Sequence, residues 1–324
     1  MRVLIWHVHG SWSTAFVQGA HEYLLPLVAD RGPDGRGRAQ TWDWPEQAHE
    51  VPVEALRDSP FDVVVLQRPH ELELLQEWTG LRAGIDVPAV YVEHNAPTEG
   101  AATSRHPLAQ HPRTQQPHIP VVHVTKFNAL MWDCGDAATT VIEHGVLDPG
   151  ALYTGDRPSL AAVVNEPVRR WRVAGTDLLL HIAKQVDVEV YGMGMAELIS
   201  HAPQLTGLVH ENLRQSTMHL ELAKHRAYLH PYRWTSLGLA LIEAMTIGQP
   251  VLALSTTEAP EAVPAAAGVV SNDLQLLVQT ARRWMHNPEE ARERGSAARQ
   301  HALRRYGLRR FLDDWDATLK EVAR

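Results

Sequence analysis

Short runs of β-branched and other apolar residues alternate with longer amphipathic stretches along the first half of the chain. Such runs are typical of parallel strands that are buried on both faces, and the stretches between them suit crossover helices. We predict helices over residues 71–79 and 127–132. The predicted strands are Val3–Trp6, Val63–Leu66, Ala89–Val92, Val121–Val124 and Thr139–Ile142.

The alternation breaks within residues 147–158, where Pro, Gly and Asp gather, and then begins again. Since 324 residues exceed what one hydrophobic core usually supports, we expect two doubly wound domains, residues 1–148 and 149–306. The second half carries predicted strands at Ala161–Val164, Val186–Tyr191, Ala227–His230 and Pro250–Leu254, and helices near Thr176–Gln185, after Ser236 and from Asp273.

The chain ends in a charged helix that opens at Asn287 and in a last helix, residues 308–322. In the last helix Phe311, Trp315 and Leu319 are spaced four apart, so they form one apolar ridge that must be buried. The Tyr306-Gly307 pair before it permits a change of direction.

Composition narrows the class of protein. The formal charge of −8 and the pI of about 6.2 argue against a nucleic-acid partner, which needs a concentrated basic surface. A single cysteine, Cys134, fits a reducing compartment and is expected to be a packed thiol. No window approaches the ~20 apolar residues of a membrane span, and the apolar run at the N-terminus is short for a signal peptide. We therefore expect a cytoplasmic protein, with peripheral membrane contact left open.

Histidine is abundant, with nineteen copies, but the spacing does not suit a metal site. His106, His111, His118 and His123 lie in a Pro-rich stretch without HExxH or paired-cysteine spacing. We interpret them as surface or hydrogen-bonded residues and expect no bound metal.

The segment from His230 to Ala253 joins a strand end to a helix and then to another strand, which is where open α/β sheets bind ligands. Gly238 permits close approach of backbone to a ligand, and the N–H groups of residues 236–239 offer a partly positive helix start to a diphosphate. The Glu243 carboxylate can accept two hydroxyl donors, as a ribose diol presents.

This segment resembles the family-4 retaining glycosyltransferases of the GT-B architecture, whose stretch reads E-x-F-G-L-x-x-x-E-A-M-x-x-G-x-P-V. The matching positions here are Thr235, Ser236, Leu237, Gly238, Leu239, Glu243, Ala244, Met245, Gly248, Pro250 and Val251. In that family the first glutamate contacts the donor sugar and the second the ribose, which implies these roles for Thr235 and Glu243. Threonine carries no charge and reaches less far than glutamate.

Three further stretches are similar to the same family. Residues 140–146 resemble V-I-x-N-G-V, with His144 in place of asparagine. Residues 163–179 resemble the diphosphate-binding region, so donor-site candidates there are Asn165, Arg169, Arg170 and Arg172. Residues 255–263 resemble D-x-G-G-x-P-E-x-V, with Thr257 and Glu258 in place of the glycine pair, which suggests a narrower or differently shaped donor pocket.

In the first half, residues 7–12 follow the first strand, where related enzymes place a glycine loop. The resemblance implies donor contact at Gly10 and a catalytic role for His94, because a family histidine in that region approaches the donor sugar. A structural, hydrogen-bonded imidazole is the alternative for His94. Acceptor contacts are expected in the loops 9–13 and 98–118, with candidates His9, Ser11, Trp12 and Asn95.

The resemblance implies two Rossmann-like doubly wound domains with a C-terminal helix, residues 307–324, crossing back to the first. It implies a transferase that moves a sugar, with retention and without metal or other cofactor, from a UDP- or GDP-type donor to a small-molecule or glycan acceptor. A degenerate nucleotide- or glycan-binding protein and a GT-B epimerase are the alternatives. A dehydrogenase is disfavoured because Gly192 and Gly194 match only the first part of G-x-G-x-x-G.

Overall fold

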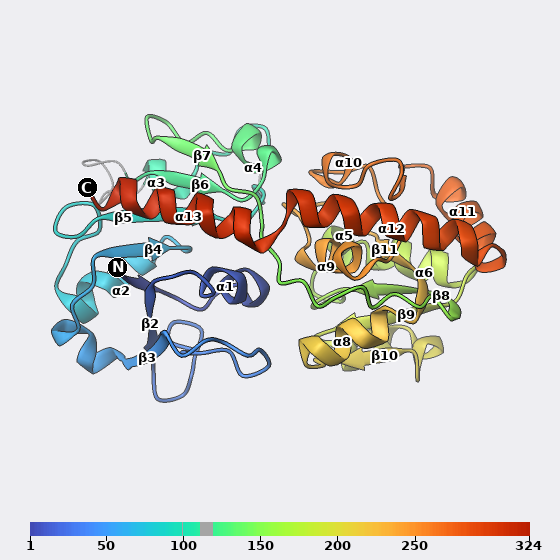
Figure 1. Cartoon of the computed structure of the whole chain (residues 1–324), viewed down its shortest axis with the longest axis horizontal. Coiled ribbons are helices and arrows are strands. Elements are labelled where there is room, and N and C mark those ends of the chain that lie inside the picture. The colour runs from blue at the N-terminus through green and yellow to red at the C-terminus, as the bar shows by residue number, and fades with distance from the viewer. Residues whose placement is uncertain (99, 111–118) are drawn as a thin grey trace. The chain divides into compact units, whose positions relative to one another are not determined.

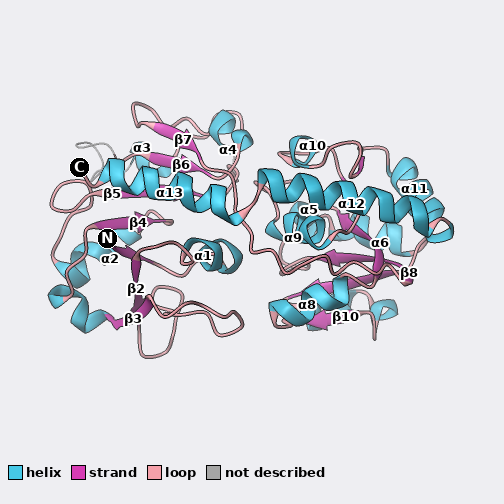
Figure 2. Ribbon diagram, in the orientation of Figure 1, coloured by secondary structure: helices cyan, strands magenta, loops and turns pink. Residues whose placement is uncertain are grey.

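The structure is a computed structural model that describes every residue except 99 and 111–118. Its residues form two compact units, Met1–Gly145 together with Leu308–Arg324, and Val146–Gly307. Each unit is a parallel sheet with helices packed on it (Figures 1 and 2). Within the described part of the chain, no helix combines the length and the apolar character that a membrane crossing requires.

The first unit is built on a seven-stranded parallel sheet of order β3-β2-β1-β4-β5-β6-β7. The five strands predicted for this half are confirmed, and two more were missed. Pro26 interrupts the strand signal of β2, and half-exposed polar residues hide the edge strand β3. The strands are β1 Arg2–Ile5, β2 Glu22–Leu27, β3 Ala48–Pro52, β4 Val63–Leu66, β5 Ala89–Glu93, β6 Val121–His123 and β7 Thr139–Val141.

Both helices predicted for the first half are present, and α2 has the predicted bounds. Helix α2 ends at Gly80, which adopts the left-handed conformation (φ 81°) typical of a helix C-cap. The helical segments of this unit are α1 Gly10–Phe16, η1 Val53–Asp58, α2 Glu71–Thr79, α3 Pro107–Gln110, α4 Lys126–Met131 and α13 Leu308–Val322.

The C-terminal helix α13 packs on the first unit, as predicted. Trp315 is 2% exposed, and its ring lies 5.6 Å from that of Trp12 and 5.2 Å from that of Phe16. The Arg310 guanidinium donates to the carbonyl of His144 at 2.6 Å, which ties α13 to the segment after β7. The apolar ridge is thus buried against α1, and the predicted crossing back is confirmed.

The second unit has a six-stranded parallel sheet of order β10-β9-β8-β11-β12-β13. All four predicted strands are present, whereas β10 and β13, with three residues each, are too short to show a period. The strands are β8 Arg157–Val163, β9 Val188–Gly192, β10 Val209–Glu211, β11 His225–His230, β12 Val251–Ala253 and β13 Gly268–Val270. The helical segments are α5 Trp171–Ala174, α6 Thr176–Ala183, α7 Met195–His201, η3 Pro203–Leu205, α8 Gln215–Leu222, α9 Leu239–Ile247, α10 Ala259–Ala262, α11 Leu274–His286 and α12 Pro288–Arg305.

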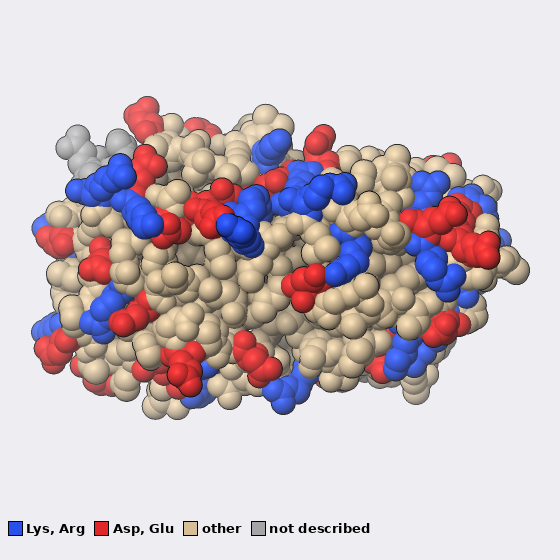
Figure 3. Space-filling model, viewed as in Figure 1, with Lys and Arg blue, Asp and Glu red and all other residues tan. Residues whose placement is uncertain are grey.

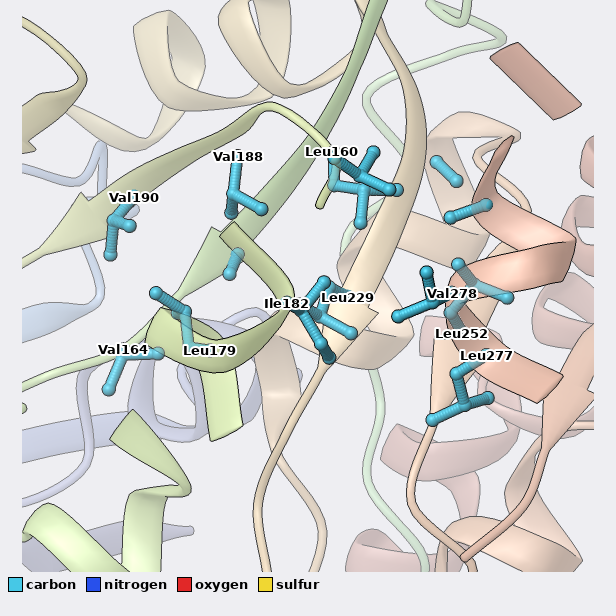
Figure 4. Close-up of a cluster of buried hydrophobic side chains, with 14 of the residues drawn as sticks. Leu160, Val164, Leu179, Ile182, Val188, Val190, Leu229, Leu252, Leu277 and Val278 are labelled. Carbon is cyan, nitrogen blue, oxygen red and sulfur yellow. The ribbon is translucent and has the colours of Figure 1, made fainter. Parts of the chain in front are cut away.

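Alternate residues of each strand in this sheet point to opposite faces, so two apolar clusters cover it. In β8, Leu160 belongs to the cluster drawn in Figure 4, together with Leu179 and Leu252, whereas Ala161 belongs to the cluster on the other face. The linker predicted over residues 147–158 is mostly irregular, but β8 begins at Arg157 and takes its last two residues.

Candidate functional site

In the second unit, the loops after β8 and β11 lie side by side at the carboxyl edge of the sheet, because the two strands are neighbours. The Arg170 guanidinium lies over the Tyr232 ring, 5.5 Å from its centroid. A Cβ at Gly175 would stand 1.8 Å from the Pro231 carbonyl oxygen, so only glycine permits this approach of the two backbones. The two loops from which these residues were predicted are therefore brought together at Arg170 and Tyr232.

The structure distinguishes the three predicted arginines. Arg169 pairs with Glu166 and Arg172 pairs with Asp177, and their side chains are 71% and 72% exposed. Arg170 is half-buried, and no carboxylate of the described residues pairs with it. Arg170 is therefore the best placed of the three to meet an anion at the strand ends.

Two polar residues hold these loops in place. The Asn165 side-chain oxygen accepts from the Met193 N–H at 3.1 Å and so joins the loop after β8 to the loop after β9. Arg233, which the sequence analysis did not select, donates to both oxygens of Asp177 at 2.6 and 2.8 Å. The Arg233 hydrogen bonds hold the pKa of that carboxyl below its usual range. Arg233 could have been identified from the sequence, because it directly follows Tyr232 within the segment from His230 to Ala253.

Helix α9 begins at Leu239, after Ser236 as predicted, with Gly238 as its N-cap. Ser236 and Leu237 are 4% and 6% exposed, and Leu237 packs in the core of the unit. The N–H groups of residues 236–238 therefore precede the helix, and of the predicted set only that of Leu239 lies in its first turn. Thr235 is half-buried ahead of this turn.

Gly238 makes room for a side chain of the protein itself. Its backbone is extended (φ −69°), and a Cβ there would stand 2.7 Å from Cε1 of His230. His230 is 2% exposed and stacks on Tyr232 at 4.7 Å between ring centroids. Burial lowers the pKa of His230 to about 3, so its imidazole is neutral near pH 7.

Glu243 lies in the middle of α9 and is 4% exposed. Its Oε1 accepts from Gln215 Nε2 at 3.0 Å, and its Oε2 lies 3.3 Å from His219 Nε2. Both partners come from α8, a helix that the sequence analysis missed because its polar and apolar positions show almost no helical period.

Thr257 and Glu258, which replace the family's glycine pair, lie directly before α10, with Glu258 as its N-cap. Thr257 adopts a left-handed backbone conformation (φ 49°), the region that favours glycine. Glu258 is 1% exposed, and its carboxylate lies 3.3 Å from Nη2 of Arg305 on α12. Its side chain is thus directed into the unit toward α12.

In the first unit, the carboxyl ends of β1 and β5 bring together three of the predicted residues. The rings of His9 and His94 lie 4.1 Å apart, and the Trp12 ring lies 4.9 Å from that of His94. Gly10 and Ser11 open α1 beside them. Nε2 of His94 is buried without a hydrogen-bond partner among the described residues.

These histidines are neutral near pH 7. Burial, then the charge of Arg68, lowers the pKa of His9 to about 4, and burial holds the pKa of His94 well below its usual range. His144, which follows β7, interacts electrostatically with both His9 and His94. Burial and His9 lower the pKa of His144 to about 3.

The loop after β5 is anchored by Glu93, which is 3% exposed. Its carboxylate accepts from the Asn95 N–H at 2.6 Å and lies 2.9 Å from Nε2 of His106. The Asn95 side chain itself is exposed. His106 is therefore hydrogen-bonded, as interpreted from the sequence. His111, His118 and the remainder of 111–118, with residue 99, belong to the predicted acceptor segment and lie outside the described residues.

Cys134 is a packed thiol, as predicted. Its Sγ lies 3.6 Å from Nε2 of the buried His123, and burial raises the pKa of the thiol to about 11. Within the described part of the chain, no group of three or more His, Cys, Asp or Glu residues is arranged to hold a metal ion. On the face drawn in Figure 3, acidic and basic side chains are interspersed.

Several known proteins are similar to this chain in sequence motif or in fold. Residues 200–301 match the family model for glycosyl transferases group 1. No curated protein matches the chain. The sucrose-phosphate synthase of Thermosynechococcus elongatus is similar over 99% of this chain and 98% of its own, with a TM-score of 0.71 and 13% identity. HepE of Anabaena, solved with UDP, is similar over 99% and 100%, with a TM-score of 0.72 and 14% identity. A glycosyltransferase of Rickettsia africae is similar over 99% of this chain and 98% of its own, with a TM-score of 0.65 and 14% identity.

The structural similarities confirm the predicted fold class, the GT-B architecture of two doubly wound units. The family match lies within the second unit and includes α8, β11 and α9. It confirms the resemblance and, with it, the predicted class of enzyme, a glycosyltransferase.

Proposed function

We propose that this glycosyltransferase binds a nucleoside diphosphate sugar at the carboxyl ends of β8 and β11 and transfers the sugar to a hydroxyl of a small molecule or glycan. The observation that carries the proposal is the convergence of Arg170 with the segment that leads to Glu243, through the contact of Arg170 with Tyr232. HepE was solved with UDP and with UDP-glucose, which favours UDP over GDP as the nucleotide.

Protein groups of opposite charge hold two parts of the donor: positive groups hold the diphosphate, and a carboxylate holds the ribose. The Arg170 guanidinium and the N–H groups in the first turn of α9 oppose the charge of the diphosphate, which grows as the sugar leaves. Glu243 accepts from the ribose hydroxyls. Thr235 contacts the donor sugar as a neutral hydroxyl, and Arg169, Arg172 and Asn165 support the loop after β8.

The first unit supplies the acceptor side. His94 acts on the donor sugar as a neutral imidazole, and Gly10 admits the donor beside it. His9, Ser11, Trp12 and Asn95 line the acceptor position. The reaction proceeds with retention and without metal, as in family 4, with the leaving diphosphate as proton acceptor. The enzyme works in the cytoplasm.

Calorimetry with UDP, GDP and ADP tests the nucleotide assignment, followed by assay of UDP-glucose consumption. A nucleotide at 100 times its Kd should stabilise the fold by about 2.7 kcal/mol, which a thermal shift detects. If none of the three nucleotides binds, the proposal fails.

Thr235, in place of the family's glutamate, favours a second candidate, a protein that binds the nucleotide sugar without turnover. Binding of UDP-glucose with neither hydrolysis nor transfer would identify that function. Conversion of the donor to an epimer, with no free nucleotide released, would instead identify an epimerase.

A further inference from the structure

We propose that Gln215 and His219 of α8 are positioning residues, which orient the Glu243 carboxylate and thereby set the preference of the site for ribose over deoxyribose nucleotides. The proposal deepens the proposed function and rests on it, because it takes Glu243 as the ribose contact. The two α8 residues and Glu243 are called the carboxylate clamp below.

The spacing of the α8 residues directs them to one place. Gln215, His219 and Leu222 are separated by four and three residues, so they share one face of the helix. Leu222 is fully buried in the same apolar cluster as Leu241 of α9, which turns this face of α8 toward α9. The helix is thus held by its apolar residue, and its two polar residues are presented to Glu243.

The clamp binds the two carboxylate oxygens separately. Gln215 Nε2 donates to Oε1 at 3.0 Å, and His219 Nε2 lies 3.3 Å from Oε2. The last torsion of a glutamate side chain is broad and has no strong rotamer preference. One donor on each oxygen limits that rotation, which neither donor achieves alone. The plane of the carboxylate, and so the direction of its lone pairs, is therefore set by α8.

The chemistry of the clamp suits a ligand with hydroxyl donors. A carboxylate has about four lone-pair sites, and the clamp uses two of them. Gln215 is neutral and does not cancel the charge of Glu243, as a lysine or arginine in its place would. Hydrogen bonds to an ionised acceptor are roughly twice as strong as neutral ones, and they depend on direction. A vicinal diol, with two hydroxyls at fixed separation, gains most from a carboxylate of fixed orientation.

The test compares the affinities of UDP and 2′-deoxy-UDP by calorimetry for the full chain and for four variants. For the wild type we expect UDP to bind at least about tenfold more tightly, the lower end for one charge-assisted hydrogen bond. In Gln215→Ala combined with His219→Ala, the ratio should fall to about twofold or less, through weaker binding of UDP at nearly constant affinity for 2′-deoxy-UDP. His219→Gln, whose amide can donate from a similar position, should retain most of the preference. Thr217→Ala, an exposed position of α8, is the matched control and should behave as the wild type.

The outcomes separate this inference from the proposed function. If the wild type binds neither UDP nor GDP, the proposed function fails first. If the wild type prefers UDP and the double variant keeps that preference, or loses affinity equally for both nucleotides, the clamp has no role in ribose recognition and the inference is overturned. Where the double variant does not fold, Gln215→Ala alone decides, because Gln215 is only half-buried. Its preference should fall several-fold, and an unchanged preference would count against the clamp.

Discussion

Replacement of Glu243 by alanine is expected to weaken UDP binding and also to destabilise the second unit. The loss of a charge-assisted contact to the ribose corresponds to about 1.5–3 kcal/mol, or about 10- to 100-fold in Kd. A surface carboxylate would show only this loss. Glu243, however, is 4% exposed and accepts from two side chains of α8, so its removal also leaves donors without an acceptor.

The cost in stability falls mainly on His219. Gln215 is half-buried and can turn its amide to water, whereas His219 is 5% exposed and cannot. One buried donor left unsatisfied costs about 1–3 kcal/mol, so we expect a loss of that size in the free energy of unfolding. Glu243→Gln keeps the shape of the side chain but presents one amide N–H₂ to a donor, so it should lose part of both quantities.

Calorimetric titration with UDP measures the first loss, and urea unfolding without nucleotide measures the second. Glu197→Ala, an exposed carboxylate of α7, is the matched control and should change neither. A Glu243→Ala protein that binds UDP within about twofold of the wild type would refute the ribose contact. Unchanged stability would refute the contribution of the α8 hydrogen bonds.

Four further predictions concern the charge, the core and the pH dependence of the protein. Arg170→Ala should weaken binding of UDP about tenfold but leave binding of uridine unchanged; equal losses for UDP and uridine would remove the diphosphate contact. Trp315→Ala should lower the free energy of unfolding of the first unit by about 3–5 kcal/mol, measured in urea, because the ring packs on Trp12 and Phe16; a loss below about 1 kcal/mol would contradict this docking of α13. Transfer should continue in the presence of a chelator, and a strict requirement for added magnesium or manganese would exclude the metal-free mechanism. The pKa of His230 is about 6.5 in the unfolded chain and about 3 in the folded chain, so the unfolded chain binds the proton first as the pH falls. The contribution of His230 to the free energy of unfolding is therefore complete above about pH 6.5 and decreases, by up to about 1.4 kcal/mol per pH unit, toward pH 3. Denaturant titrations between pH 7 and 4 should show a smaller slope for His230→Asn, and an identical slope would refute the assignment.

The sequence alone determined the fold class and the edge of the sheet where we propose the donor site. Strands buried on both faces must be continuous apolar runs, so β4 was predicted with its observed bounds, and the helical period did the same for α2 and α13. Since parallel strands carry their ligand loops at their carboxyl ends, the order of elements was enough to select the segments after β8 and β11. These inferences depend only on local pattern and on chain order.

Tertiary structure decided how the selected residues are used. Nothing local distinguishes Arg170 from Arg169 and Arg172, because the difference is which carboxylate, or which aromatic ring, another segment brings near. The vacant side of Gly238 is filled by His230, eight residues earlier and on another element. The orientation of Glu243 comes from α8, whose sequence shows almost no helical period. Only the packing of α8 against α9 brings its polar side chains to Glu243. Such contacts join residues distant in the chain, and a pattern read along one segment carries no information about them.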